Sequence, residues 1–173
     1  MDRAIGSARK TVGSQHAPVL DVPASLDPLR DVLARGNTRE IIDALSAPQH
    51  DDNPDAQLVL ARFLALDGEL GRASGIYHRL AEGPDPHRRR ALVGKAGLLL
   101  QLGLLDSALA LFDGVCAEAP SDLDASEGRA QALERLGRLG EAAAEYRRFV
   151  GLANARADLR VRVAQQWLDA HVL

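Results

Sequence analysis

Apolar residues recur at steps of three and four along most of the chain, the spacing that places side chains on one face of a helix. In GLLLQLGLLDSALALFDGV (97–115), a Leu-Gly pair is followed by an alanine five residues after the glycine and by an aromatic ring nine residues after it. The same order recurs in ALERLGRLGEAAAEYRRF (132–149), where Gly137 lies 34 residues after Gly103. A period of this length is typical of stacked helix–turn–helix units.

Start and stop signals divide the chain into helices. Four places combine a capping side chain with a proline or an acidic residue in the first turn: Asp27-Pro28, Asn53-Pro54, Asp85-Pro86, and Ser121 with Asp124. Four glycines suit the left-handed residue that ends a helix: Gly36, Gly68, Gly103 and Gly137. The pattern predicts helices at about 28–35, 38–46, 55–67, 71–82, 89–102, 106–118, 122–136, 140–153 and 157–171.

Three of the predicted hairpins carry small and large residues in the same register. The first helix holds Ala61, Ala96 and Ala130 with Leu64, Leu99 and Leu133, and the second holds Ala73, Ala108 and Ala142 with Tyr77, Phe112 and Tyr146, followed by Leu80, Val115 and Phe149. A small alanine allows two helices to approach closely, while the ring four residues later fills the space between successive hairpins.

This register resembles the tetratricopeptide repeat family over about residues 55 to 154. The resemblance implies an all-α, right-handed superhelical solenoid of helix–turn–helix repeats. We expect a repeat domain at 26–173, with a degenerate hairpin at 28–47, three units at 55–86, 89–120 and 122–154, and a capping helix at 157–171. The chain departs from the family pattern where an early aromatic is replaced by Gln57, Leu92 and Ser126, and where a leucine is replaced by Lys95 and Arg129.

The two ends of the chain have different compositions. Residues 1–25 show no helical period and contain two glycines and two prolines, which predicts an extended arm. Its segment 17–26 is more apolar than a solvated linker, so we expect it to dock in the groove of its own chain or of a neighbour. On the closing helix we expect Leu159, Val163, Trp167 and Val172 to face inward and Arg160 outward.

Composition and charge support a helical, water-soluble chain. Hydrophobic residues make up 46% and aromatic residues only 3%, so leucine and alanine must build the core, and both favour helices. A net charge of −3 argues against a specific nucleic-acid binder, and the basic run 87–90 is interpreted as a solvated helix end. With no apolar run long enough to span a membrane and no secretory signal pattern, we expect a cytoplasmic protein.

The sequence predicts no catalytic residue, metal site or cofactor. Cys116 is the single cysteine and falls in an apolar helical pattern, where a thiol behaves as a small hydrophobe. The histidines lack metal-ligand spacing, and the aspartates at 51, 52 and 55 fit a solvated loop better than a calcium loop. An enzyme would require a histidine and Cys116 to converge in one pocket.

The family resemblance implies that the first helix of each unit lines a concave groove. One branch of the family grips carboxylates with basic residues there, but of the equivalent positions here only Arg62 has the right charge, which excludes a carboxylate clamp. Gly94 and Gly97 lie one turn apart and predict either a hollow or close helix packing. The predicted groove residues are Leu58, Arg62, Leu66, Val93, Gly97, Leu100, Gln101, Gln131 and Glu134.

An apolar groove with a polar rim indicates non-catalytic protein binding. The function expected is that of an adaptor, assembly factor or chaperone that holds an apolar segment of a protein or peptide partner. The alternative is a structural subunit that self-associates through its arm and end faces, forming a homo-oligomer through the N-terminal arm. The fold class alone does not choose between these two.

Overall fold

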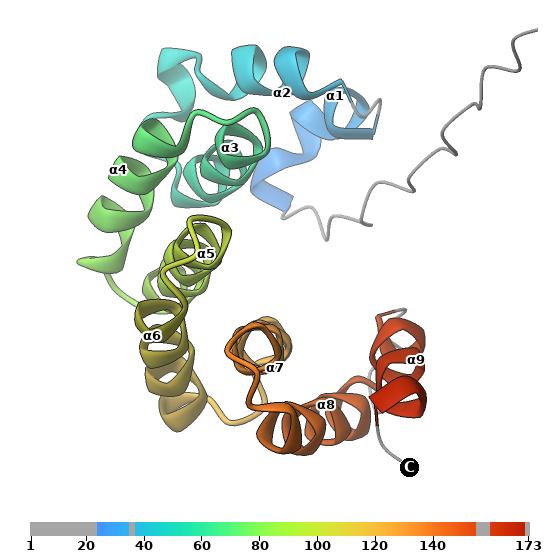
Figure 1. Ribbon diagram of the computed structural model, residues 1–173. Coiled ribbons are helices and arrows are strands. Elements are labelled where there is room, and N and C mark those ends of the chain that lie inside the picture. The colour runs from blue at the N-terminus through green and yellow to red at the C-terminus, as the bar shows by residue number, and fades with distance from the viewer. Residues whose placement is uncertain (1–23, 35–36, 155–159, 172–173) are drawn as a thin grey trace, which may run out of the picture.

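The computed structural model describes residues 24–34, 37–154 and 160–171, and these residues form helices joined by short turns (Figure 1). The elements are η1 (Ala24–Leu29), α1 (Arg30–Ala34), α2 (Thr38–Leu45), η2 (Pro48–His50), α3 (Pro54–Leu66), α4 (Leu70–Ala81), α5 (His87–Gln101), α6 (Leu105–Glu118), α7 (Leu123–Arg135), α8 (Leu139–Asn154) and α9 (Val161–His171). The arm predicted at 1–25 lies outside the described residues except for Ala24 and Ser25.

The helices stack as an arc of antiparallel pairs (Figure 1). The pairs are α3 with α4, α5 with α6, and α7 with α8; the first helix of each lies on the inner side of the arc and the second on the outer side. Successive inner helices touch one another, α2 packs on α3, and α9 packs on α8. The predicted all-α repeat solenoid, with a leading hairpin and a closing helix, is confirmed.

The turns inside the three pairs have the same geometry because a glycine occupies the same place in each. Gly68, Gly103 and Gly137 have φ angles of +87°, +76° and +76°, which a residue with a side chain rarely adopts. The backbone N–H of the next residue donates to the carbonyl five residues back, at 2.8 Å from Glu69 to Leu64. This bond closes each first helix and directs the chain into the second.

The helix starts agree only in part with the capping signals in the sequence. The Asn53 side chain accepts hydrogen bonds from the backbone N–H groups of Asp55 and Ala56, as predicted. The cap of α7 is Asp122 rather than Ser121, because the Asp122 carboxylate accepts from the backbone N–H of Ala125.

The signals at Asp27 and Asp85 were wrong as caps. Asp85 forms ion pairs with Arg88 and Arg89 instead of capping α5, which begins at His87. Asp27 lies inside η1, where it pairs with Arg30. In both places the carboxylate reaches a nearby guanidinium.

Packing within and between the pairs follows the predicted register. The six alanines of the repeat are fully buried: Ala61, Ala73, Ala96, Ala108, Ala130 and Ala142. The three rings are almost fully buried: Tyr77, Phe112 and Tyr146. The Tyr77 ring of α4 lies over Gly94 of α5, where an added Cβ would be 2.3 Å from it. The Phe112 ring of α6 lies over Gly128 of α7 at the same distance. Of the two alternatives left open for Gly94, close helix packing is the correct one, because the Tyr77 ring fills the space over it.

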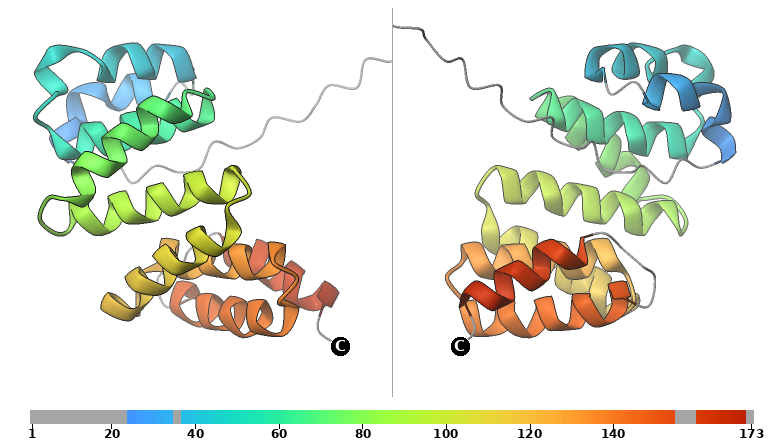
Figure 2. Two further views of the ribbon diagram at one scale, coloured as in Figure 1. Left: turned by 60° about the vertical axis from the view of Figure 1, so that its left-hand side comes forward. Right: turned by 90° about the vertical axis from the view of Figure 1, so that its right-hand side faces the viewer.

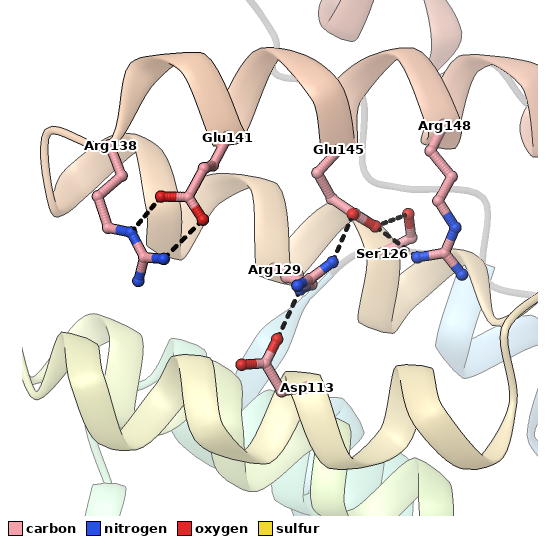
Figure 3. A network of polar contacts seen from close by, with 7 residues as sticks. All are labelled: Asp113, Ser126, Arg129, Arg138, Glu141, Glu145 and Arg148. Atoms are coloured by element: carbon pink, nitrogen blue, oxygen red, sulfur yellow. Dashed lines mark hydrogen bonds and ion pairs between the residues drawn. The ribbon is translucent and has the colours of Figure 1, made fainter.

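Polar residues that replace the family's large apolar ones are satisfied by partners on the second helix. Ser126 and Arg129 of α7 both donate to the buried Glu145 of α8, at 2.8 and 2.7 Å (Figure 3). Arg148 adds a third contact to Glu145 at 2.8 Å, and Arg129 also bonds Asp113 of α6 at 2.6 Å (Figure 3). This network joins three helices and balances the buried carboxylate with two guanidinium groups.

In the first unit, Gln57 takes the place of the family's aromatic and is satisfied in a similar way. Its amide oxygen accepts from Arg79 of α4 at 2.7 Å, and its amide nitrogen donates to the carbonyl of His50 at 3.2 Å. Gln57 is buried. These two bonds allow a polar side chain to lie between two helices at little cost.

The closing helix packs through only part of the face predicted from the sequence, because Trp167 faces inward as expected but Val163 does not. Ala164 and Leu168 are buried, and Trp167 contacts Tyr146 with ring centroids 4.6 Å apart. Val163, expected to face inward, is 67% exposed. Arg160, expected outside, lies with its guanidinium carbon 5.5 Å from the centre of the Phe149 ring. Leu159 and Val172 lie outside the described residues.

Candidate interaction face

The nine groove residues predicted from the sequence all lie on the inner helices α3, α5 and α7 (Figure 1). We call them the inner face: Leu58, Arg62, Leu66, Val93, Gly97, Leu100, Gln101, Gln131 and Glu134. Arg62, Leu66 and Gln101 are exposed, and Val93, Gly97, Gln131 and Glu134 are half-buried. The exposed and half-buried members are the ones that a partner would contact.

Leu58 and Leu100 are buried members of the inner face, with 6% and 8% of their surface exposed. Leu58 belongs to the apolar cluster that joins the leading hairpin to α3 and α4. Leu100 belongs to the next cluster, with Phe112 and Leu133. Their side chains chiefly stabilise the fold, so a charged substitution at either residue would unfold the chain before it revealed anything about binding.

Gly97 differs from Gly94, one turn away on the same helix. No heavy atom lies within 4 Å of a Cβ added at Gly97, apart from its own chain neighbours and helix backbone. Its φ angle is not in the left-handed region, so neither the turn nor packing requires glycine here. The missing side chain leaves the backbone of α5 accessible in the middle of the inner face.

Ion pairs connect the N-terminal ends of the inner helices. Asp55 of α3 accepts from Arg90 of α5 at 2.7 Å and from Ser25 at 3.0 Å, and its carboxylate lies 3.4 Å from His87. Burial alone would raise the pKa of Asp55, but the bonds from Arg90 and Ser25 outweigh it and lower the pKa. The negative charge of Asp55 is therefore balanced within the chain by Arg90.

At the equivalent end of the third unit, Arg160 bonds two carboxylates of the inner helix. Its guanidinium bonds Asp124 at 2.7 Å and Glu127 at 2.5 Å, both on α7. Arg160 stands just before α9, so these bonds tie the closing helix to the last inner helix.

The phenol groups of two repeat rings have pKa values that reflect their neighbours on the inner face. Burial raises the pKa of Tyr77 to about 12, and the charge of Arg62 partly opposes the shift. Burial also raises the pKa of Tyr146, whose hydroxyl donates to Glu134 at 2.9 Å. Arg62 is exposed and makes no ion pair with any described residue.

The side chains that the sequence analysis considered for catalysis or metal binding either lie in the core or do not come together. Cys116 is buried beside Arg148 and Glu145, and burial raises the pKa of its thiol, which reduces its reactivity. Within the described ranges, no three histidine, cysteine, aspartate or glutamate side chains gather as a metal site. None of the helices in those ranges is long and apolar enough to span a membrane.

The sequence reasoning missed a second exposed region, at the turns between the paired helices. Leu102, Leu104 and Leu139 are all strongly exposed there. Leu102 and Leu104 flank the turn glycine Gly103, and Leu139 lies two residues after Gly137, but the glycines were interpreted only as markers of helix ends. Periodicity does not show that a leucine beside a turn glycine points away from the core.

A stack of helical hairpins with small residues and rings in a fixed register is a helical-repeat solenoid. The family model described as tetratricopeptide repeat matches residues 72–122 and 117–158, together about half of the chain. The chain belongs to the tetratricopeptide repeat family, and its architecture is that of a protein–protein interaction or scaffold module.

Solved structures with a similar fold include several MamA proteins. MamA 41-end from Desulfovibrio magneticus RS-1 has 19% identity and a TM-score of 0.57 over 86% of this chain and 94% of that chain. A MamA RS-1 ArsTM double mutant has 20% identity and a TM-score of 0.57 over 86% and 93%. A MamA AMB-1 structure has 18% identity and a TM-score of 0.54 over 84% and 95%. At these identities the likeness concerns the fold. No curated protein matches the sequence.

Proposed function

We propose that the chain is a non-catalytic adaptor, assembly factor or chaperone that binds an apolar segment of a partner protein along its inner face. The observation that carries the proposal is the open space at Gly97. Glycine in the middle of a helix costs about 1 kcal/mol relative to alanine. Since neither packing nor backbone conformation requires it at Gly97, close approach of a ligand backbone is the role that we assign to it.

The neighbouring side chains supply the chemistry for an apolar segment with polar ends. Leu66 of α3 and Val93 of α5 offer apolar surface, and the edges of Leu58 and Leu100 add to it. The partner's backbone would be held in register by Arg62, Gln101, Gln131 and Glu134. An extended or helical segment that crosses the inner helices would meet these groups in turn.

The test compares two leucine substitutions that differ only in the face they affect. Gly97→Leu fills the open space on α5, and Gly114→Leu does the same on the outer helix α6, where an added Cβ also meets nothing within 4 Å. Both replace a helical glycine by a strong helix former, so both should fold at least as well as the parent chain. The probe is a library of random twelve-residue peptides displayed on phage, selected on the parent chain.

Selected peptides with an apolar centre should bind the parent chain and the Gly114→Leu chain equally. On the Gly97→Leu chain their affinity, measured by calorimetry with the synthetic peptides, should fall by about tenfold or more. Equal affinity for all three chains would refute the inner face as the binding site.

A further inference from the structure

The three turns inside the helix pairs lie along one side of the solenoid, while the loops that join successive pairs lie along the opposite side (Figure 2, left). We call this side the turn edge and define it as Asp67–Glu69, Leu102–Leu104 and Leu136–Arg138, with the first two residues of the helix that follows each turn. Within the described part of the chain, it holds three of the five large hydrophobic residues that are strongly exposed.

Leucine is concentrated at the middle turn. Leu102 and Leu104 flank Gly103 and are 55% and 52% exposed, and Leu139 at the third turn is 47% exposed. Single exposed leucines are ordinary on a protein surface, but several on one edge are typical of an interaction surface. The apolar centre of the turn edge is therefore at the middle unit.

The charges on either side of this centre have opposite sign at equivalent positions. The residue that follows the turn glycine is Glu69 in the first unit, Leu104 in the second and Arg138 in the third. If a second copy is laid antiparallel along the edge, each Glu69 meets an Arg138 and Leu104 meets Leu104. At the position after the turn glycine, the turn edge is thus complementary to a second copy about a twofold axis.

The glycines of the first and third units fit the same arrangement. Gly71 and Gly140 each lie three residues after the turn glycine, in the first turn of α4 and of α8. An added Cβ at either glycine meets nothing within 4 Å, so neither is required by packing inside the chain. Each leaves room at the outer units for an approaching side chain, such as a leucine of a second copy.

We propose that two copies of this chain pair antiparallel through their turn edges, with Leu104 at the twofold axis. The monomer's own ion pairs do not oppose this contact. Glu69 already bonds Arg72 at 2.7 Å and Arg39 at 3.3 Å, and Arg138 bonds Glu141 at 2.6 Å, but these groups are all at least partly exposed and can accept a further partner. The interface leaves the inner face free, and it differs from the contact through the arm that the sequence suggested.

Sedimentation velocity over a concentration series up to about 200 μM tests the proposal by mass action. The parent chain should sediment as a dimer at the upper end, and Leu102→Glu/Leu104→Glu should weaken the dimer by about a hundredfold or more, because two carboxylates would be buried near their symmetry copies. Val163→Glu is the control, since Val163 is exposed on α9 away from the edge. A parent chain that stays monomeric, or a dimer unaffected by the leucine substitutions, would overturn the proposal.

A charge exchange tests the antiparallel arrangement. Glu69→Arg alone places like charges together across the interface and should weaken the dimer by about tenfold. Glu69→Arg/Arg138→Glu restores opposite charges only if each residue faces the other's copy, so the dimer should recover. Failure of the double variant to recover would contradict this pairing.

A disulfide tests the position of the axis. In a chain with Cys116→Ala and Leu104→Cys, two copies should crosslink rapidly under mild oxidation, because a residue at a twofold axis lies next to itself. The same background with Val163→Cys should remain monomeric on a non-reducing gel. Equal crosslinking of the two chains would place the axis elsewhere and overturn the proposal.

Discussion

Two sets of equivalent positions on the inner helices differ in what surrounds them. The first set faces the preceding helix pair and consists of Val59, Gly94 and Gly128. The second set lies three residues later, on the inner face, and consists of Arg62, Gly97 and Gln131. Packing against the preceding helix pair determines which residue fits at the first set, whereas packing does not limit the residue at the second set. A glycine on an inner helix can therefore either accommodate the ring of the preceding pair or leave open space.

The residue in the first set depends on the helix before it. Tyr77 precedes Gly94 and Phe112 precedes Gly128, and in both units the ring occupies the place of the missing side chain. No aromatic residue occurs in α2, and the equivalent position in the first unit is the buried Val59. The volume lost in one helix is matched by volume gained in the other, as close packing requires.

The second set varies in charge and size because no core contact limits it. Arg62 is exposed and cationic, Gly97 is open, and Gln131 bonds Glu127 on its own helix. Such variation costs the fold little, and each unit carries a different group at this position.

The largest effect is expected for Gly128→Val. The added side chain would begin 2.3 Å from the Phe112 ring, so α6 and α7 would have to separate. We expect a loss of about 3 kcal/mol in the free energy of unfolding, measured by urea titration. Gly114→Val is the control, because that glycine lies in open space on α6. A Gly128→Val chain as stable as its control would show that the ring does not fill the notch.

A smaller loss is expected for Val59→Ala. This change removes two buried methyl groups from the apolar cluster of the first unit, which should lower the free energy of unfolding by about 1–2 kcal/mol. A stabilised Val59→Ala chain, in the same urea titration, would mean that every unit requires a small residue at this position.

Most of the fold could be predicted because helix periodicity and turn glycines are local signals. The bounds of α3 to α8 agree with prediction to within about two residues, as is usual for helix ends. The alanines and rings of the repeat were assigned correctly because their spacing of 34 or 35 residues leaves no other register. On α9 the prediction was wrong at one position: Val163 was expected to face inward because it is larger, but the neighbouring Ala164 is the buried residue.

The candidate site was less predictable because exposure depends on the neighbouring helix. Gly94 and Gly97 look alike in the sequence, and only the position of Tyr77 distinguishes them. Leu100 and Leu102 are both leucines near the end of α5, yet one is buried and the other exposed. The buried Glu145 is acceptable only because Arg129 and Arg148 reach it.

The measurement that tests the account most directly is urea unfolding of Gly94→Ala and Gly97→Ala side by side. Both changes add one methyl group to α5 and improve its helix propensity equally. Gly97→Ala should raise the free energy of unfolding by about 0.5–1 kcal/mol, since its methyl group enters open space. Gly94→Ala should lower it by about 1 kcal/mol or more, because its methyl group meets Tyr77. Changes of the same sign in both chains would contradict the distinction between a packing notch and an open binding face.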